Sequence, residues 1–234
     1  MTGAIDQAIA AVRAGGGTAL DLSGLRFRKL RESVRDLTTL TRLDLSSNQL
    51  SMLPDWIGEL TALTELDLRG NALTELPQTI GNLTALTRLD LRDNRLTGLP
   101  DSIGSLRSLT VLDAARNKLT ALPDSIGELT ALTKLDLWSC DLQELPDSIG
   151  KLIALTELDV ANNQLTGLPD TIGNLTSLRK LSAYRNKLRR LPDSIGSITS
   201  LTRLELSLNE LTELPESIAG RTGLDVGGNA IAGY

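Results

Sequence analysis

Leucines recur along most of this chain at fixed spacings. Leu43 begins the first of eight consecutive units, and the same leucine returns every 23 residues up to Leu204. The eight prolines keep this register, since every interval from Pro54 to Pro215 is also 23 residues. A fixed period between about 20 and 50 residues is typical of a solenoid, in which each unit forms one coil and stacks on the next.

Each unit contains two hydrophobic patterns. The first is L-x-L-x-x-N-x-L, whose Leu-Asp-Leu alternation predicts a short strand with both leucines inward and the Asp outward. The second is L-P-x-x-I-G-x-L-x-x-L, whose three-residue spacing predicts a helical or 3₁₀ turn on the back of the coil, started by the proline. The glycine in it allows neighbouring coils to pack closely.

The asparagine of the first pattern predicts a ladder of side-chain amides. Each amide would bond backbone groups in the turn after the strand, which would otherwise be buried without partners. The ladder positions are Asn48, Asn71, Asn94, Asn117, Asn163, Asn186, Asn209 and Asn229. Cys140 occupies the one remaining position, where a thiol can replace the amide as a weak buried donor. We therefore expect Cys140 to be structural and inert.

The N-terminal end departs from the repeat pattern. Residues 3–14 predict a short helix, because Ile5, Ile9 and Val12 recur at helical spacing and three glycines follow. We interpret this helix as a cap on the first coil. A helix lying on a membrane surface is disfavoured, since the polar face carries little positive charge.

The outermost repeats are also atypical. A degenerate unit begins at Leu20, and a truncated unit at residues 224–229 arrives three residues early. The sequence leaves open whether the tail, a second copy or a partner covers the last coil. The expected organisation is an N-terminal helical cap (1–19), the leucine-rich repeats (20–223), and a truncated last repeat with a C-terminal tail (224–234).

The pattern LPxxIGxLTxLTxLDLSxNxLTxLP, which covers residues 20–231, resembles the 23-residue leucine-rich repeats of Ras-group proteins and of bacterial Roco proteins. The resemblance implies an α/β solenoid, an arc with a concave parallel β-sheet of about ten strands and short helical or 3₁₀ return segments on the convex side. It also implies a recognition scaffold, and for the Ras group a scaffold or regulator of a small GTPase. The chain itself has no G-x-x-x-x-G-K-[ST] motif.

Composition narrows the chemistry. The chain has no histidine and one cysteine, which excludes Ser-His-Asp triads, imidazole metal sites and an internal disulfide. We expect no enzymatic activity, cofactor or metal. A net charge of −5 disfavours nucleic acid and anionic membranes as partners. The N-terminus lacks the pattern of an export signal, so we expect a cytoplasmic location. Eighteen Arg against six Lys suggest a GC-rich bacterial source.

An Asp column follows from the strand pattern. One carboxylate per coil should lie between the two inward leucines, and parallel strands are about 4.8 Å apart. Three interpretations remain open: a solvated lattice with flanking Arg and Lys, a calcium site, which the lack of Gly-rich ligand loops disfavours, or a surface for a partner's basic residues. Ser182 and Glu205 replace Asp in two coils, and the column comprises Asp21, Asp44, Asp67, Asp90, Asp113, Asp136, Asp159 and Asp225.

The outward position two residues after each Asp varies while the frame stays fixed. It carries Ser46, Arg69, Arg92, Ala115, Trp138, Ala161, Tyr184 and Ser207. The rings of Trp138 and Tyr184, two coils apart, should stand about 10 Å apart on one face. Trp, Tyr and Arg are the residue types that dominate binding hot spots. Trp56 lies in a return segment and should pack against the neighbouring coil.

The stretch 179–190, RKLSAYRNKLRR, holds six basic residues and no acidic one. Together with basic residues of earlier coils it should form a positive strip beside the aromatics. This strip is either solvated or a docking site for an acidic segment of a partner. We predict non-catalytic protein or peptide recognition on the concave face and on its ascending edge, the side that follows the strands. Self-assembly through the C-terminal end is an alternative, and the expected partner-binding residues are Arg69, Arg92, Arg116, Trp138, Tyr184, Arg185, Lys187 and Leu208.

Overall fold

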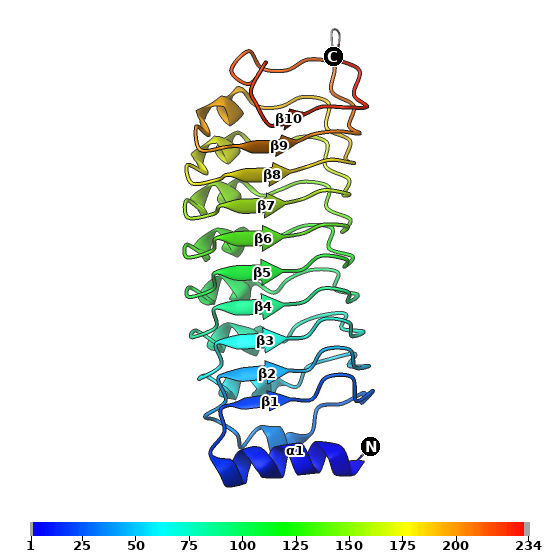
Figure 1. Ribbon diagram of the computed structural model, residues 1–234, viewed down its shortest axis with the longest axis vertical. Helices are drawn as coiled ribbons and strands as arrows, with labels where there is room; N and C mark the ends of the chain where they lie inside the picture. Colours follow the sequence, from blue (N-terminus) through cyan, green and yellow to red (C-terminus); the bar gives the residue numbers. More distant parts are fainter. Residues whose placement is uncertain (1, 232–234) are drawn as a thin grey trace.

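The computed structural model describes residues 2–231. Ten short strands in this range form one parallel sheet (Figure 1). The strands follow chain order, and neighbouring regular coils pair with a shift of 23 residues, as in Leu43 with Leu66. The strands are β1 (Ala19–Asp21), β2 (Arg42–Asp44), β3 (Glu65–Asp67), β4 (Arg88–Asp90), β5 (Val111–Asp113), β6 (Lys134–Asp136), β7 (Glu157–Asp159), β8 (Lys180–Ser182), β9 (Arg203–Glu205) and β10 (Leu224–Asp225).

The return segments that precede β2 to β9 are 3₁₀ helices. In seven of the eight the preceding proline is the N-cap, with extended backbone such as φ −69° and ψ 151° at Pro100, so the proline begins the turn as expected. The bounds are η1 (Glu32–Val34), η2 (Asp55–Glu59), η3 (Gln78–Asn82), η4 (Asp101–Ser105), η5 (Asp124–Glu128), η6 (Asp147–Lys151), η7 (Asp170–Asn174) and η8 (Asp193–Ser197).

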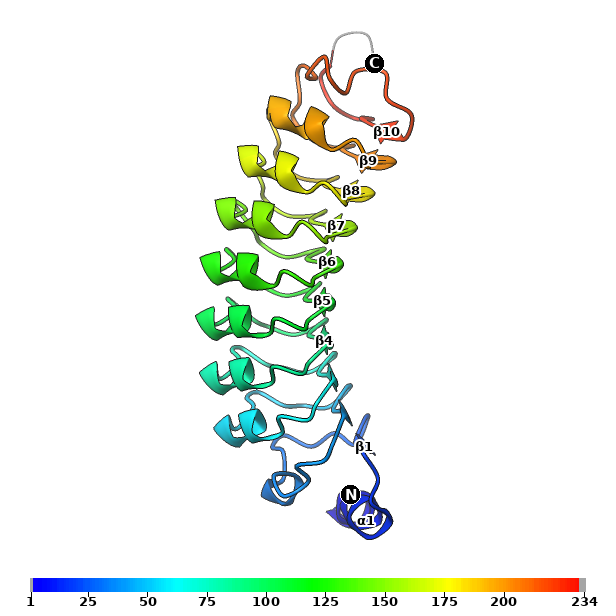
Figure 2. The same cartoon turned by 90° about the vertical axis from the view of Figure 1, so that its left-hand side faces the viewer.

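The sheet lines the concave side of a shallow arc, and the 3₁₀ helices line the convex side (Figure 2). On the convex side, the glycines of η2 to η7 lie close to the backbone of the next coil. A Cβ built on Gly104 would lie 2.6 Å from the carbonyl oxygen of Ser125 in the next coil, so only glycine fits there. The predicted arc, its concave parallel sheet and its short return segments are confirmed.

The core is a continuous stack of aliphatic side chains. Ile80, Leu83 and Leu86 from one return segment are fully buried, as are the equivalent residues of the following coils through Leu178. Trp56 is partly buried and packs against this core. Because each coil buries its leucines against both neighbours, the stack sets the positions of the outward residues between them.

Two polar ladders run along the stack. The predicted asparagine ladder is present: the Asn94 amide donates to the carbonyls of Leu68 and Leu91 and accepts the N–H of Leu73. Cys140 takes the equivalent place, with Sγ 3.4 Å from the carbonyl oxygen of Ala114. A second ladder is not anticipated by the sequence analysis. In it, threonine hydroxyls just before the strands donate to carbonyls one coil earlier, and its donors are Thr41, Thr64, Thr87, Thr110, Thr133, Thr156 and Thr202.

Each end of the stack has its own cover. Helix α1 (Thr2–Gly15) lies beside β1 and buries Ile5 and Ile9. The helix ends at the glycines, as the sequence indicates. The N–H of Gly17 donates to the carbonyl of Val12, and Gly16 has a φ of +61°, which glycine adopts readily. The C-terminal segment packs back on the preceding coil, where the Arg221 guanidinium donates to the carbonyls of Gly196 and Ile198. The last three residues of the expected tail, 232–234, lie outside the described residues.

Candidate functional site

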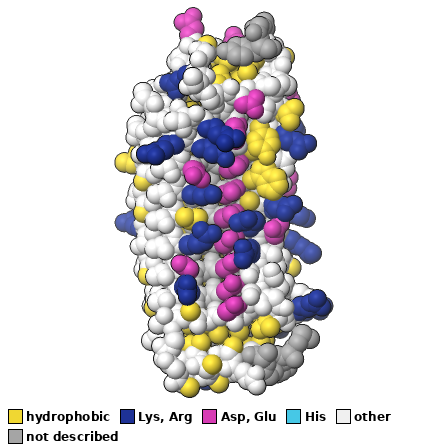
Figure 3. Space-filling view, viewed as in Figure 1, with side chains coloured by type: hydrophobic (Ala, Val, Ile, Leu, Met, Phe, Trp, Pro, Cys, Tyr) yellow, Lys and Arg dark blue, Asp and Glu magenta, His cyan; other side chains and the backbone are white. Residues whose placement is uncertain are grey.

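The Asp column runs along the middle of the concave face, with basic side chains on both sides (Figure 3). Each carboxylate also has a local role that sequence reasoning missed. The Oδ1 atom of Asp136, for example, accepts the backbone N–H of Trp138 at 3.1 Å. The same bond to the residue two positions later is made by Asp21, Asp44, Asp67, Asp90, Asp113, Asp159 and Asp225. The repeated Asp is thus explained first by the turn that follows the strand.

Cations neutralise this column unevenly. The Arg92 guanidinium lies 2.6 Å from Asp113 Oδ2 and 3.5 Å from Asp90 Oδ2, so it bridges two neighbouring carboxylates. Arg69 likewise lies 3.3 Å from Asp67. Within the part of the chain that the structure describes, Asp136 and Asp159 have no basic atom within 4.0 Å. The centre of the column is therefore short of positive charge.

Two carboxyl groups in this part of the column, those of Asp113 and Asp159, have a raised pKa. Burial raises the pKa of Asp159 to about 6, and the charge of Asp136 adds to this shift more than Lys180 offsets it. Burial, followed by repulsion from Asp136, also raises the pKa of Asp113. Since Asp113 is shifted upward despite its contact with Arg92, the resident cations do not offset the crowding of carboxylates.

Trp138 and Tyr184 meet beside these carboxylates. The indole Nε1–H of Trp138 donates to the phenolic oxygen of Tyr184 at 3.1 Å, across the intervening coil. The expectation that the rings stand about 10 Å apart is therefore wrong at their polar tips, because the side chain of Ala161 between them is too small to hold them apart. Ala161 is 0% exposed although it lies outside the core, so its larger neighbours cover it. Ser46 and Ala115, also expected to point outward, are buried too.

A shallow pocket adjoins the aromatic pair. Its volume is about 340 Å³, which suits one long side chain or a small group. The Arg116 guanidinium lies 5.3 Å from the centroid of the Trp138 ring and 3.4 Å from Asp93 Oδ1, so a resident cation already covers part of the indole. The pocket is lined by Arg92, Asp93, Ala115, Arg116, Asp136, Trp138, Asp159 and Tyr184.

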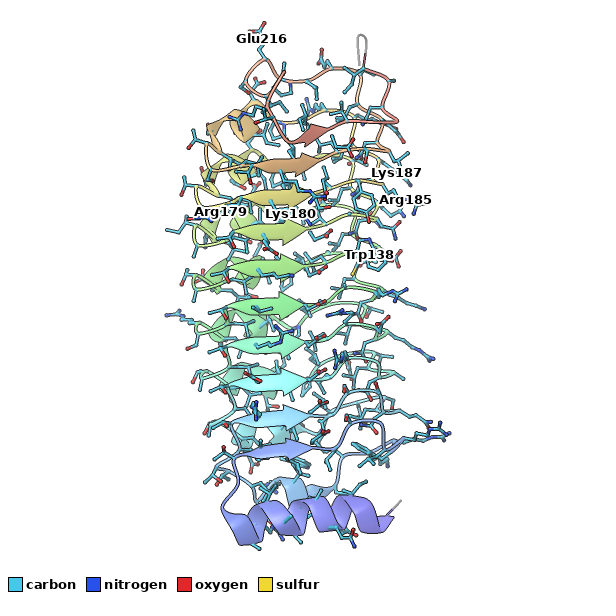
Figure 4. The ribbon with its side chains drawn as sticks, viewed as in Figure 1. Trp138, Arg179, Lys180, Arg185, Lys187 and Glu216 are labelled. Atoms are coloured by element: carbon cyan, nitrogen blue, oxygen red, sulfur yellow. The ribbon has the colours of Figure 1, made fainter. Side chains whose placement is uncertain are left out.

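The remaining predicted residues lie outside this pocket. Arg185 and Lys187 are exposed beyond the C-terminal end of β8, on the ascending edge beside Tyr184 (Figure 4). Arg179 and Lys180 belong to the same basic stretch but lie at the opposite end of that strand (Figure 4). The strand itself separates the two pairs, so the stretch does not form the single strip expected from the sequence.

Arg69 and Leu208 occupy the two flanks of the site. Arg69 follows β3, one coil before Arg92, and pairs with its own coil's Asp67. Leu208 follows β9 and is 54% exposed, with a φ of +57° that a bulky residue rarely adopts. The structure thus brings together four predicted residues in one pocket, Arg92, Arg116, Trp138 and Tyr184, and leaves the other four around it.

Metal binding and thiol chemistry are not favoured by the described residues. These residues contain no cluster of three His, Cys, Asp or Glu side chains arranged to hold a metal ion. Burial raises the pKa of the Cys140 thiol to about 11, because the charged thiolate is disfavoured inside the stack. Among the residues of 2–231, no helix is long and apolar enough to cross a membrane.

The repeat signature decides the family. The leucine-rich repeat region family matches residues 57–142 and 113–189, and the leucine rich repeat family matches residues 18–73. The chain belongs to the leucine-rich repeat family. No match is found among curated proteins.

Solved leucine-rich repeat structures share its architecture. A leucine-rich repeat protein of Leptospira interrogans is 33% identical with a TM-score of 0.74, over 87% of this chain and 59% of that one. The functional domain of InlJ from Listeria monocytogenes is 29% identical with a TM-score of 0.80, over 97% and 46%. The plant peptide hormone receptor RGFR1, in complex with RGF2, is 33% identical with a TM-score of 0.75, over 86% and 34%. The chain spans less than two thirds of the length of each of these proteins.

Proposed function

We propose that this leucine-rich repeat protein is a non-catalytic recognition module that binds a protein or peptide partner on its concave face and ascending edge. The observation that carries the proposal is the hydrogen-bonded pair of Trp138 and Tyr184, held at 3.1 Å on the outer surface of the sheet. A rigid aromatic pair offers large contact area at little cost in conformational entropy. Receptors of this fold, such as RGFR1 with RGF2, support binding of a peptide.

The ascending edge adds a charged contact to this proposal. Arg185 and Lys187 are exposed, and neither has an acidic atom within 4.0 Å among the described residues. An acidic segment of the partner would pair with them, while the aromatic pair anchors an adjoining part of the same partner. Leu208 provides an exposed apolar surface one coil further along.

The test compares single variants in capture of partners from a lysate of the source cells. Trp138→Ala and Tyr184→Ala should each weaken binding by more than about 1 kcal/mol, because each removes a hot-spot side chain. Ile153→Ala is the control, since Ile153 is an apolar residue outside the pocket with 58% of its surface exposed. Circular dichroism should show all three variants folded. Unchanged capture by both aromatic variants would overturn the proposal.

A cytoplasmic location is part of this proposal, supported by the single, buried, free cysteine. The resemblance to Ras-group proteins stays a prediction. No contact among residues 2–231 favours a small GTPase over another protein as the partner.

A further inference from the structure

We infer that the pocket beside Trp138 receives a lysine or arginine side chain of the partner, with its cationic group on Asp136 and Asp159 and its aliphatic stem on the aromatic pair. This inference rests on the proposed function and specifies the chemistry that the site reads. It also gives the Asp column a second role besides the turn, and only at its centre.

The charges around the pocket favour a cation. Its lining holds three carboxylates and two guanidinium groups. Both guanidinium groups are already occupied: Arg92 binds Asp113 and Asp90, which lie outside the lining, and Arg116 pairs with Asp93. Asp136 and Asp159 are left without an ion pair inside the described chain. A partner's carboxylate placed here would meet both of them, whereas a cation would relieve their mutual repulsion.

The two carboxylates are also oriented for a shared ligand. They stand at equivalent positions of the paired strands β6 and β7, about 4.8 Å apart as parallel strands require. Each uses Oδ1 to accept a backbone N–H, from Trp138 at 3.1 Å and from Ala161 at 3.0 Å. This fixes both side chains and leaves both Oδ2 atoms for a cation, which an ammonium or guanidinium group can bridge.

The aromatic pair supplies the other half of such a site. Lysine and arginine bury their methylene stems on apolar surface while the charged end stays at a polar group. Trp138 and Tyr184 fix each other through their hydrogen bond, so their exposed surfaces are held in place for that stem. A cation near such rings is also attracted by the π-systems.

The rest of the Asp column lacks this combination. Asp21 and Asp44 also have no ion pair among the described residues, and they line a pocket of similar volume, about 330 Å³, at the N-terminal end of the sheet. No aromatic side chain lines that pocket. Two neighbouring column carboxylates without an ion pair therefore occur at two places among the described residues, and only the central pair stands beside an aromatic surface.

The test uses three short probes: acetyl-Gly-Arg-Gly-amide, the same peptide with citrulline in place of Arg, and the same peptide with Glu. Citrulline keeps the size and most hydrogen-bonding groups of arginine but carries no charge. Binding is followed by the indole N–H signals of the two tryptophans in ¹⁵N-labelled protein, with Trp56→Phe to assign the Trp138 signal. A probe of this size should bind with a Kd on the order of 1 mM.

We expect the arginine probe to shift the Trp138 signal saturably and the citrulline and glutamate probes to bind at least about tenfold more weakly, a difference of about 1.4 kcal/mol. The double variant Asp136→Asn/Asp159→Asn should bind the arginine probe more weakly than the wild type by a similar factor. Its amide oxygens can still accept the two backbone N–H groups, so the fold should be kept. Asp44→Asn is the matched control and should leave binding unchanged.

Equal binding of arginine and citrulline probes would overturn the inference, as would tighter binding of the glutamate probe. Absence of a saturable shift with the arginine probe at about ten times the expected Kd would overturn it too. These results are distinguishable from failure of the proposed function. If partner capture still depends on Trp138 while the probes show no preference for charge, only the inference about the cation fails.

Discussion

The surroundings of Asp159 disfavour its ionised form. Burial raises its pKa to about 6, and three other charged groups act on it, Asp136 from β6, Lys180 from β8 and Glu205 from β9. The ordinary pKa in an unfolded chain is 3.8. Between these two values the folded protein keeps a proton that the unfolded chain has lost, so the free energy of unfolding falls as pH rises through this window.

Replacing Asp159 with Asn should therefore stabilise the protein at pH 7 and have little effect near pH 4, where the native carboxyl group is already neutral. We expect a gain of about 1–2 kcal/mol, reduced from the full shift because the side chain is partly exposed. Urea unfolding of wild type and variant across this range measures the difference. The amide oxygen can still accept the Ala161 N–H, so the turn is preserved.

Asp21 provides the control of opposite sign. The backbone N–H and the hydroxyl of Ser23 lower the pKa of Asp21, so its ionised form favours the folded state. Above pH 4, Asp21→Asn should be slightly less stable than the wild type. This difference should disappear as the pH falls through the native pKa, because the wild-type carboxyl group then becomes neutral as well. A loss of stability in Asp159→Asn at pH 7, in parallel with Asp21→Asn, would contradict the assignment.

At the level of elements, the 3₁₀ helices depend on a close approach between coils. A Cβ built on Gly150 in η6 would lie 2.5 Å from the carbonyl oxygen of Thr171 in the next coil. Backbone cannot yield as a flexible side chain does, so Gly150→Ala must push two coils apart. We expect a loss of about 2–3 kcal/mol in the free energy of unfolding, measured by urea denaturation.

Gly167→Ala tests whether this loss reflects position rather than the change from Gly to Ala. Gly167 lies in a loop with no atom within 4 Å of a built Cβ and has no positive φ. There the alanine should be neutral or stabilising by up to about 1 kcal/mol, because it reduces the freedom of the unfolded chain. Similar losses in both variants would contradict the close-packing explanation.

These elements were predictable from the sequence because each follows from a column with one consistent residue type. The leucines, prolines and asparagines predict strands, 3₁₀ helices and an amide ladder, and all three are found. The threonine ladder was missed because a threonine in a polar position resembles ordinary surface residues. The turn-forming role of the Asp column was not predicted because the Leu-Asp-Leu alternation shows only that the carboxylate faces outward, and not which backbone N–H it accepts.

The candidate site was less predictable, since it depends on the directions in which side chains of different coils point. Sequence register places Trp138 and Tyr184 two coils apart, but their contact requires the small side chain of Ala161 between them. Likewise, a run of basic residues in the sequence does not show that Lys180 and Arg185 lie at opposite ends of β8. Position along a strand decides which edge each side chain reaches, and a count of charges carries no such information.

At the scale of the whole molecule, a solenoid is stabilised only between neighbouring coils, so its ends limit its stability. The N-terminal end is covered by α1, a helix of 14 residues with Ile5 and Ile9 buried. The C-terminal end has a shorter cover: β10 has two residues, and Leu214, Leu224 and Ile231 are only partly buried against the core. Opening should therefore begin at the C-terminal coils.

Arg221 should control that opening. Its guanidinium donates to the carbonyls of Gly196 at 2.8 Å and Ile198 at 3.1 Å, so it ties the last segment to the end of η8. Bonds from a charged donor to partly buried carbonyls contribute about 1.5–3 kcal/mol each, and Arg221→Ala leaves both carbonyls without this donor. Hydrogen–deuterium exchange followed by mass spectrometry should show faster exchange across residues 193–231 and unchanged exchange across residues 88–160.

Arg190→Ala, which removes an exposed arginine nearby, is the control and should leave exchange in both regions unchanged. Faster exchange spread evenly over the whole stack would instead mean that the coils open as one unit, contrary to the nearest-neighbour picture.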